Sequence, residues 1–209
     1  MIATYEQRLN SDVNLALREG SMHFEEKSAV HDSLHRIATR LQELKIPHAV
    51  VGGMALFYHG FRRFTEDVDI LVTRSALEEI HRRLDGLGWI PPFQGSKNLR
   101  DAETGVKVEF LVTGEYPGDG KPKPVSFPDP ADVAVEIGGV SFASVAALVE
   151  LKLASGISSA DRLKDLGDVQ EVIRHLRLPR DLGNQINPYV RDKYFEIWDA
   201  TDRTRSSDE

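Results

Sequence analysis

Apolar residues recur along this chain with two different spacings. Between residues 30 and 44 they fall at steps of four and three, the spacing of one face of an amphipathic helix, and Pro47 follows the end of the pattern. The stretches 48–51, 67–72 and 106–112 are short and rich in Val and other apolar residues, as strands are. Beyond Ala143 the spacing becomes helical again. The pattern predicts a sheet flanked by helices and a helical C-terminal part.

Start and stop signals refine the first part of this outline. A helix over 53–60 is expected between the first two strands. Ser75 and Glu78 match a capping box, which predicts a helix over 75–87 with Ser75 as its N-cap. The proline- and glycine-rich stretch 114–130 predicts a long surface loop, either a mobile connection or a substrate flap.

The C-terminal third carries similar signals. Gly138 and Gly139 separate two short apolar stretches, which indicates a hairpin. The first helix after it is expected to end at Gly156, a residue type common after helix ends. The second helix is expected over 159–177, with Leu163 on its apolar face, because Pro179 cannot continue it.

Two aspartates at the start of the second strand are the strongest chemical feature. Successive side chains of a strand point to opposite faces, so Asp67 and Asp69 share one face. Such a pair of carboxylates repels itself unless a divalent cation lies between them, and Mg²⁺ together with nucleotide phosphates is a common partner. Gly52 and Gly53 end the first strand, and glycines let backbone N–H groups approach an anion closely.

These residues resemble a known family. A hydrophobic residue followed by Gly52-Gly53, thirteen residues, then Asp67-Val68-Asp69 is similar to the motif of the polymerase-β type nucleotidyltransferase superfamily. The residues between the two halves are closest to nucleotidyltransferases related to abortive-infection (AbiEii-like) toxins. The resemblance covers about residues 30 to 176. It implies an α/β (α+β) fold, a polymerase-β-like core with a mixed sheet flanked by helices and a C-terminal helical part.

The resemblance also implies a third carboxylate. In the superfamily, a carboxylate on a neighbouring strand completes the metal site and helps to deprotonate the attacking hydroxyl. Glu109 lies in the middle of an apolar strand and is the candidate, although many members carry Asp there. The alternative is a solvent-facing Glu109 beside Lys107 on an edge strand. The implied metal ligands and catalytic residues are Asp67, Asp69 and Glu109, and the implied cofactor is Mg²⁺ or Mn²⁺.

Further residues are candidates for contact with a bound nucleotide. The LK segment around Lys152 and the KD-x-x-D segment that begins at Lys164 again resemble the abortive-infection group, where the two helices close over the nucleotide. Lys152 is a candidate for the triphosphate, since lysine offers phosphate a mobile charge. Lys164 could instead belong to a solvated charge network with neighbouring aspartates. Arg63 and Thr65 could fix phosphates or brace the turn before Asp67. The implied nucleotide-binding set is Gly52, Gly53, Arg63, Thr65, Lys152 and Lys164.

Composition excludes several other classes. A formal net charge of −7 argues against a broad surface that tracks phosphates. There is no cysteine, no G-x-S-x-G, no P-loop Lys-Ser/Thr and no third glycine of a dinucleotide fingerprint. His31 and His35 have the spacing of a zinc pair, yet the helical pattern places both on a polar face and signals no third ligand. No apolar run is long enough to span a bilayer, so a cytoplasmic location is expected.

The sequence therefore predicts a metal-dependent nucleotidyltransferase that uses an NTP such as ATP. The acceptor is open: an RNA end, a protein hydroxyl or a small molecule such as an aminoglycoside. A toxin-antitoxin component with an antitoxin partner, and a nucleotide-binding interaction module that has lost catalysis, are alternatives. The expected division is an N-terminal extension over 1–28, a nucleotidyltransferase core over 29–142 and a helical region over 143–209.

Overall fold

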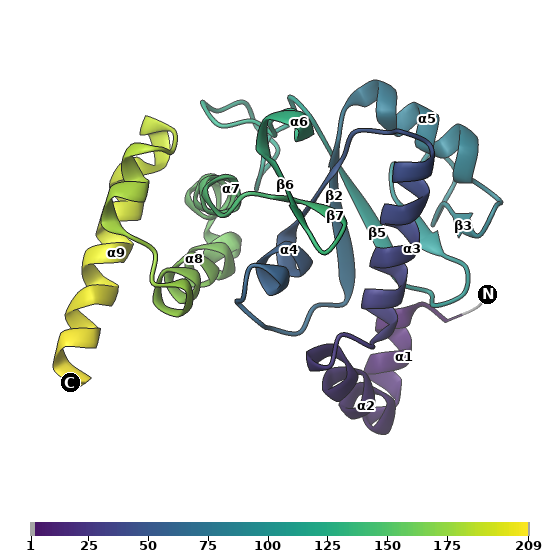
Figure 1. The fold of residues 1–209 in the computed structure, drawn as a ribbon, viewed down its shortest axis with the longest axis horizontal. Coiled ribbons are helices and arrows are strands. Elements are labelled where there is room, and N and C mark those ends of the chain that lie inside the picture. Colours follow the sequence, from purple (N-terminus) through teal and green to yellow (C-terminus); the bar gives the residue numbers. More distant parts are fainter. Residues whose placement is uncertain (1–2, 209) are drawn as a thin grey trace. The chain divides into compact units, whose positions relative to one another are not determined.

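The chain folds into two compact units in a computed structural model that describes residues 3–208 (Figure 1). The first unit comprises residues 3–58, 62–113 and 129–143, and the second comprises 59–61, 114–128 and 144–208. The boundary after residue 143 coincides with the change from strand to helical spacing in the sequence. The three-part division expected from the sequence stays a prediction.

The first unit is built on one seven-stranded mixed sheet in the order β3-β4-β5-β2-β1-β7-β6. The two central pairings define the site: β2 runs parallel to β5 and antiparallel to β1. At the other side, β1 runs parallel to β7, which forms a hairpin with β6. The strands are β1 (Ala49–Val51), β2 (Asp67–Val72), β3 (Trp89–Ile90), β4 (Leu99–Asp101), β5 (Lys107–Val112), β6 (Ala134–Ile137) and β7 (Val140–Ala143).

Alternation along the central strands separates the core from the polar face. Val68, Ile70 and Phe110 are fully buried, whereas Asp69 and Glu109 on the other face are partly exposed. Helices α3 (Ala29–Glu43), α4 (Gly52–Tyr58) and α5 (Arg74–Leu84) complete the core, together with the short α6 (Pro130–Val133). The apolar stripe predicted for α3 is confirmed, since its residues from Val30 to Leu41 at steps of four and three are buried.

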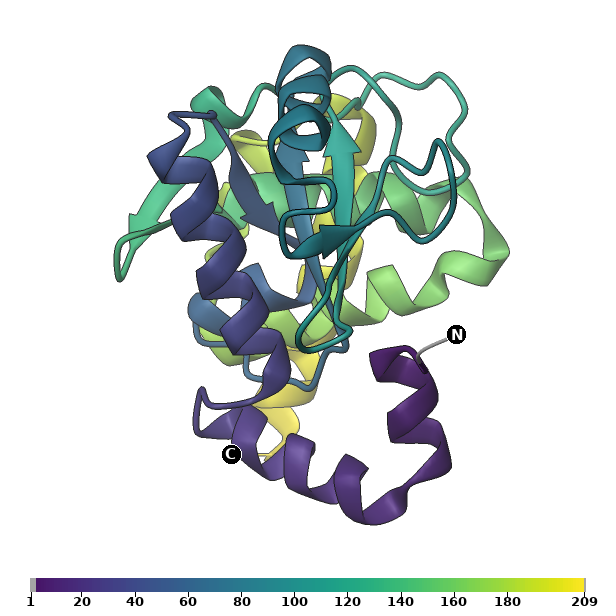
Figure 2. The ribbon, with the colours of Figure 1, turned by 90° about the vertical axis from the view of Figure 1, so that its right-hand side faces the viewer.

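Two N-terminal helices precede the core, and Figure 2 shows them meeting at a sharp angle. They are α1 (Tyr5–Ser11) and α2 (Val13–Phe24). The backbone N–H of Tyr5 donates to the Gly105 carbonyl at 3.3 Å, and Glu6 forms an ion pair with Arg100 at 2.9 Å. The Tyr5 hydroxyl donates to Glu19 at 2.9 Å, which joins the two helices. The N-terminal residues are therefore fastened to the turn between β4 and β5.

The second unit is helical, as the sequence predicts. It contains α7 (Val145–Ser158), α8 (Leu163–Leu176), α9 (Pro188–Asp208) and two short 3₁₀ helices, Ala160–Arg162 and Arg180–Asn184. The loop over 114–128 carries buried Val125, and its ends are joined because Phe127 N–H donates to the Glu115 carbonyl at 2.8 Å. Across residues 3–208, no helix combines the length and apolar composition needed to cross a bilayer.

Two local predictions about helix ends are wrong. The N-cap of α5 is Thr73, whose side chain accepts from Ala76 N–H, and Ser75 lies inside the helix, because the helix follows β2 directly. Helix α7 continues past Gly156 to Ser158. A Cβ at Gly156 would lie 2.6 Å from the Leu166 side chain, so this glycine allows close packing of α7 and α8.

Two burial predictions are also wrong. Leu163, expected on an apolar face, is 65% exposed because it stands at the first residue of α8. His31, expected on a polar face, is fully buried. Its ring contacts those of His23 and Phe57, with centroids 4.7 and 5.1 Å apart, because α2 covers this side of α3.

The buried His31 predicts a loss of stability in mild acid. Burial lowers the pKa of His31 to about 4, and the neighbouring His23 and His35 act in the same direction. Since the unfolded chain protonates near pH 6.5, it binds the proton first, and stability falls as pH decreases from about 6.5 to about 4. The loss from this residue is about 3 kcal/mol. We expect urea titrations of His31→Gln to show a shallower decline than the parent chain.

His35→Gln should flatten the decline less than His31→Gln does, because His35 contributes only part of the lowering of the His31 pKa. An equal pH slope in the His31→Gln and parent chains would contradict this account.

Candidate active site

Three carboxylates converge on the polar face of the sheet. Asp67 and Asp69 stand on β2, and the parallel register places Asp69 opposite Glu109 of β5. One oxygen from each carboxylate lies within 4.8 Å of the others, and all three residues are partly exposed. The expected convergence of Glu109 with the two aspartates is confirmed. Because β5 lies between β2 and β4, the alternative of an edge strand is wrong.

The Gly52 turn is fitted against one of these carboxylates. Gly52 has a φ of +64°, in the left-handed region that favours glycine. A Cβ at Gly52 would lie 1.9 Å from Oδ2 of Asp69. The strand pairing explains this approach, since Val51 is the register partner of Asp69. Only a residue without a side chain lets the turn and the carboxylate occupy this corner together.

Thr65 lies two residues before β2 and contacts both Asp67 and the Gly52-Gly53 turn. Its hydroxyl donates to Oδ1 of Asp67 at 2.9 Å, and a Cβ at Gly53 would lie 2.8 Å from Thr65 Oγ1. This contact supports the bracing role considered for Thr65. The Arg63 carbonyl accepts from His23 Nε2 at 3.0 Å, which fixes the backbone of the segment leading into β2.

The sequence prediction missed two residues around this site. His23, 40 positions before Arg63, is fully buried and also lies 3.2 Å from Ser28 Oγ. No pattern links it to the site, because the contact is between distant parts of the chain. The sequence predicts Lys107 only as a solvent-facing neighbour of Glu109. The signal in the sequence is the two-residue spacing of Lys107 and Glu109, which puts both side chains on the polar face of β5.

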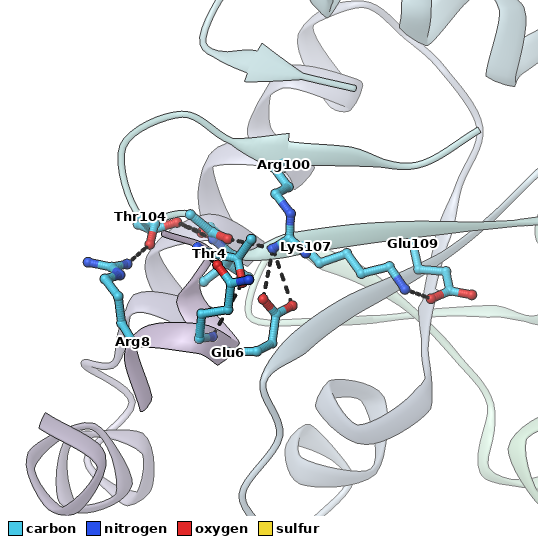
Figure 3. A network of polar contacts seen from close by, with 11 residues as sticks. Thr4, Glu6, Arg8, Arg100, Thr104, Lys107 and Glu109 are labelled. Atoms are coloured by element: carbon cyan, nitrogen blue, oxygen red, sulfur yellow. Dashed lines mark hydrogen bonds and ion pairs between the residues drawn. The ribbon is translucent and has the colours of Figure 1, made fainter. Parts of the chain in front are cut away.

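Lys107 adds a positive charge to the carboxylates. Its ammonium donates to Oε2 of Glu109, as Figure 3 shows, and both side chains are about 30% exposed or less. Burial lowers the pKa of Lys107, but the hydrogen bond to Glu109 and the negative charges of Glu109, Asp67 and Asp69 outweigh it, so the pKa is raised. The ammonium therefore interacts with all three carboxylates.

The three carboxylates fit a divalent cation. Mg²⁺ and Mn²⁺ prefer oxygen ligands, and two Mg²⁺ ligands on opposite sides of the ion lie about 4.2 Å apart. The oxygens of Asp67, Asp69 and Glu109 lie within 4.8 Å of one another, close to that span across one ion. Among residues 3–203, whose side chains the structure describes, this is the one group of three or more His, Cys, Asp or Glu side chains with the spacing to hold a metal ion. The metal-binding role itself stays a prediction.

Lys152 and Lys164 lie in the second unit. The Lys152 ammonium donates to Asp165 at 3.0 Å and to Asp168 at 2.7 Å, and the Lys152 side chain is 13% exposed. Asp165 also accepts from Ser155 Oγ at 2.7 Å. The two aspartates of the KD-x-x-D segment thus pair with Lys152 of α7, a partner that the network predicted around Lys164 does not include. Lys164 is exposed in the first turn of α8, so its nucleotide-binding role stays a prediction.

Comparisons with known proteins bear on the fold. No family model and no curated protein sequence matches the chain. The structure of ANT(2″)-Ia in complex with adenylyl-2″-tobramycin matches 84% of this chain and 97% of that chain, with a TM-score of 0.51 and 15% identity. This likeness confirms the predicted fold class, a nucleotidyltransferase-type mixed sheet flanked by helices.

Two further structures are similar at lower scores. A candidate nucleotidyltransferase from Thermotoga maritima is 21% identical over 66% of this chain and 91% of that chain, with a TM-score of 0.47. An antigenic nucleotidyltransferase-like protein from Paracoccidioides brasiliensis is 16% identical over 68% of this chain and 74% of that chain, with a TM-score of 0.43. The fold assignment rests on the first comparison.

Proposed function

We propose that this protein is a metal-dependent nucleotidyltransferase, which transfers a nucleoside monophosphate from an NTP to an acceptor hydroxyl. The observation that carries the proposal is the convergence of Asp67, Asp69 and Glu109 on one sheet face, with the Gly52 turn against Asp69. The nucleotidyltransferase-type fold supports the same reaction class.

Each residue has a distinct task in this proposal. Asp67 and Asp69 would hold a Mg²⁺ or Mn²⁺ ion, with Thr65 fixing the orientation of Asp67, and Glu109 would share a second ion with them. When bound, the ion would supply charge neutralisation and would lower the pKa of an acceptor hydroxyl. Gly52 and Gly53 present backbone without side chains, which leaves room for phosphates beside the carboxylates.

The reaction then follows from these positions. Glu109 accepts the proton of the acceptor hydroxyl, whose oxygen forms a bond to the α-phosphorus of the NTP. The bond from that phosphorus to the bridging oxygen of the β-phosphate breaks, and pyrophosphate leaves. The protein contributes alignment and electrostatics and forms no covalent intermediate.

The direct test is transfer of label from α-³²P-labelled NTPs. Total RNA, lysate protein and a panel of hydroxylated small molecules are offered separately as acceptors with Mg²⁺ or Mn²⁺. We expect one acceptor class to take up label and the Asp67→Asn, Asp69→Asn chain to transfer none. Equal labelling by the parent and variant chains would contradict the proposal.

The acceptor and the biological setting stay open within this proposal. ANT(2″)-Ia was solved with adenylyl-2″-tobramycin, which makes hydroxylated small molecules a class to include in the panel. A toxin-antitoxin role rests on the resemblance to abortive-infection proteins, and an adjacent antitoxin gene would favour it. A binding module without catalysis is the alternative, and the full set of three carboxylates favours catalysis over it.

We further propose that Lys152 contacts the triphosphate of a bound NTP. Lys152→Ala should weaken NTP binding by about 1–3 kcal/mol, the scale of a lost charge-assisted hydrogen bond. The same change leaves Asp165 and Asp168 without their lysine, so the melting temperature should fall as well. Calorimetric NTP binding, measured well below the melting temperature, separates the two effects.

The matched control is Asp165→Asn, which disturbs the same network without removing the cation. Unchanged NTP affinity in a folded Lys152→Ala chain would limit Lys152 to its structural contacts.

A further inference from the structure

The polar face around Glu109 holds two basic side chains with different partners. Arg100 of β4 is the register partner of Lys107 of β5, so both side chains start from neighbouring positions on the sheet. Arg100 is engaged by Glu6 of α1 at 2.9 Å and by the Gly105 carbonyl at 2.8 Å. Figure 3 shows Arg100 turned to Glu6 and Lys107 turned to Glu109. Lys107, and not Arg100, is therefore the basic residue that contacts the carboxylate cluster.

The Lys107 ammonium contacts a carboxylate that the proposed function assigns to the metal. Lys107 donates to Oε2 of Glu109, and the register places Lys107 directly opposite Asp67. An ammonium and a divalent ion at neighbouring positions repel each other, and they compete for the same carboxylate oxygens. Either the ammonium moves away when a metal binds, or the metal binds against its charge. Both cases lower the affinity for the metal.

We propose that Lys107 is a tethered cation that occupies Glu109 in the metal-free protein and weakens binding of a divalent ion. This inference rests on the proposed function, because it takes Asp67, Asp69 and Glu109 as the metal ligands. Lys107 stabilises the three carboxylates while the ion is absent. An incoming NTP adds negative charge, and the ion is then held best as part of a metal-nucleotide complex. Lys107 would therefore favour joint binding of metal and nucleotide over binding of metal alone.

The test measures binding of Mn²⁺ alone to the full chain, by electron paramagnetic resonance of the free ion. Lys107→Gln should bind Mn²⁺ about five- to tenfold more tightly than the parent chain, the range for removing one partly exposed charge beside the ion. Lys107→Arg keeps the charge and should bind Mn²⁺ as the parent does. Lys27→Gln is the matched control, because Lys27 also pairs with a glutamate two positions away, at 3.2 Å and outside the cluster.

A second measurement separates this role from a purely structural one. Without metal, Lys107→Gln should melt below the parent chain, since the three carboxylates then repel one another with less compensation. Saturating Mn²⁺ should remove that difference. A structural lysine would lower the melting temperature equally with and without Mn²⁺. If the Gln variant does not fold, Lys107→Met is used, because it keeps the apolar stem of the side chain.

The outcomes distinguish failure of the inference from failure of the proposed function. If the parent chain binds Mn²⁺ through Asp67 and Asp69, and Lys107→Gln binds it with unchanged affinity, the inference is wrong and the proposed function stands. If neither chain binds Mn²⁺, the inference is wrong and the metal-dependent reaction loses its support as well. Equal tightening by Lys107→Gln and Lys27→Gln would reduce the effect to net charge and would also overturn the inference.

Discussion

Replacing Asp67 and Asp69 together with Asn is expected to reduce nucleotidyl transfer by about 10³-fold or more. A catalytic metal supplies several kcal/mol of charge stabilisation, and each 1.4 kcal/mol corresponds to about a tenfold change in rate. The Asn side chains keep the shape of Asp and still offer an oxygen to the Thr65 hydroxyl, but they bind divalent ions weakly. Calorimetry should show that Mg²⁺ or Mn²⁺ no longer strengthens NTP binding.

The folded state should tolerate this double change. Asp67 and Asp69 lie on the same strand face with Glu109 within 4.8 Å, so neutralising two of the three carboxylates relieves repulsion in the metal-free protein. The melting temperature without metal should therefore be equal to or above that of the parent chain. The control is Asp132→Asn with Glu136→Gln, two exposed carboxylates in and beside the edge strand β6, which should leave activity unchanged. Metal-independent NTP binding of equal affinity in the parent and Asn chains would sink the metal assignment.

How much of this site could be predicted depends on whether a residue acts locally or through distant contacts. The shared face of Asp67 and Asp69 follows from the two-residue period of a strand, and buried Val68 and Ile70 on the other face confirm it. The place of Glu109 does not follow from any local pattern. Its position opposite Asp69 requires β5 to pair in parallel with β2, and only the family resemblance indicated that strand order.

The predictions from sequence are wrong where two local patterns compete, or where a residue is buried by another element of the fold. Thr73 and Ser75 both have the hydroxyl of an N-cap, and the direct passage from β2 into α5 selects Thr73. Gly156 has the residue type of a helix end, yet its contact with Leu166 makes it a packing position within α7. His31 is buried by His23 of α2, and no spacing within α3 could indicate that contact.

The role of Lys107 could not be predicted from its own segment of sequence either. A Lys-x-Glu pair on a strand is ordinarily a solvated ion pair of little consequence. Its meaning changes because the neighbouring strand brings Asp67 and Asp69 to the same face, so that one ammonium interacts with three carboxylates. The chemistry of the site is therefore a property of the β2–β5 register as much as of the motif.

Gly52→Ala is expected to have the second large effect, because the added methyl group meets two separate obstacles. Gly52 has a φ of +64°, a conformation that costs a residue with a Cβ about 1–2 kcal/mol. The new Cβ would also lie 1.9 Å from Oδ2 of Asp69, so the carboxylate or the turn must move. A displacement of about 1 Å in a catalytic group can lower the rate about 10²-fold, and we expect a loss of that size in nucleotidyl transfer.

Two other glycines separate these obstacles. Gly138 has a φ of +58° with nothing within 4 Å of its Cβ position, so Gly138→Ala introduces the backbone strain alone. Gly20 lies inside α2 with its Cβ position equally open, and Gly20→Ala should raise stability by about 0.5–1 kcal/mol. Both control chains should keep the parent Mn²⁺ affinity and transfer rate. Gly52→Ala should lose more stability than Gly138→Ala, and it alone should lose Mn²⁺ affinity and activity, because Asp69 is the side chain that its methyl group displaces. Parent-level Mn²⁺ binding by a folded Gly52→Ala chain would show that the close fit between this turn and Asp69 is not needed to form the site.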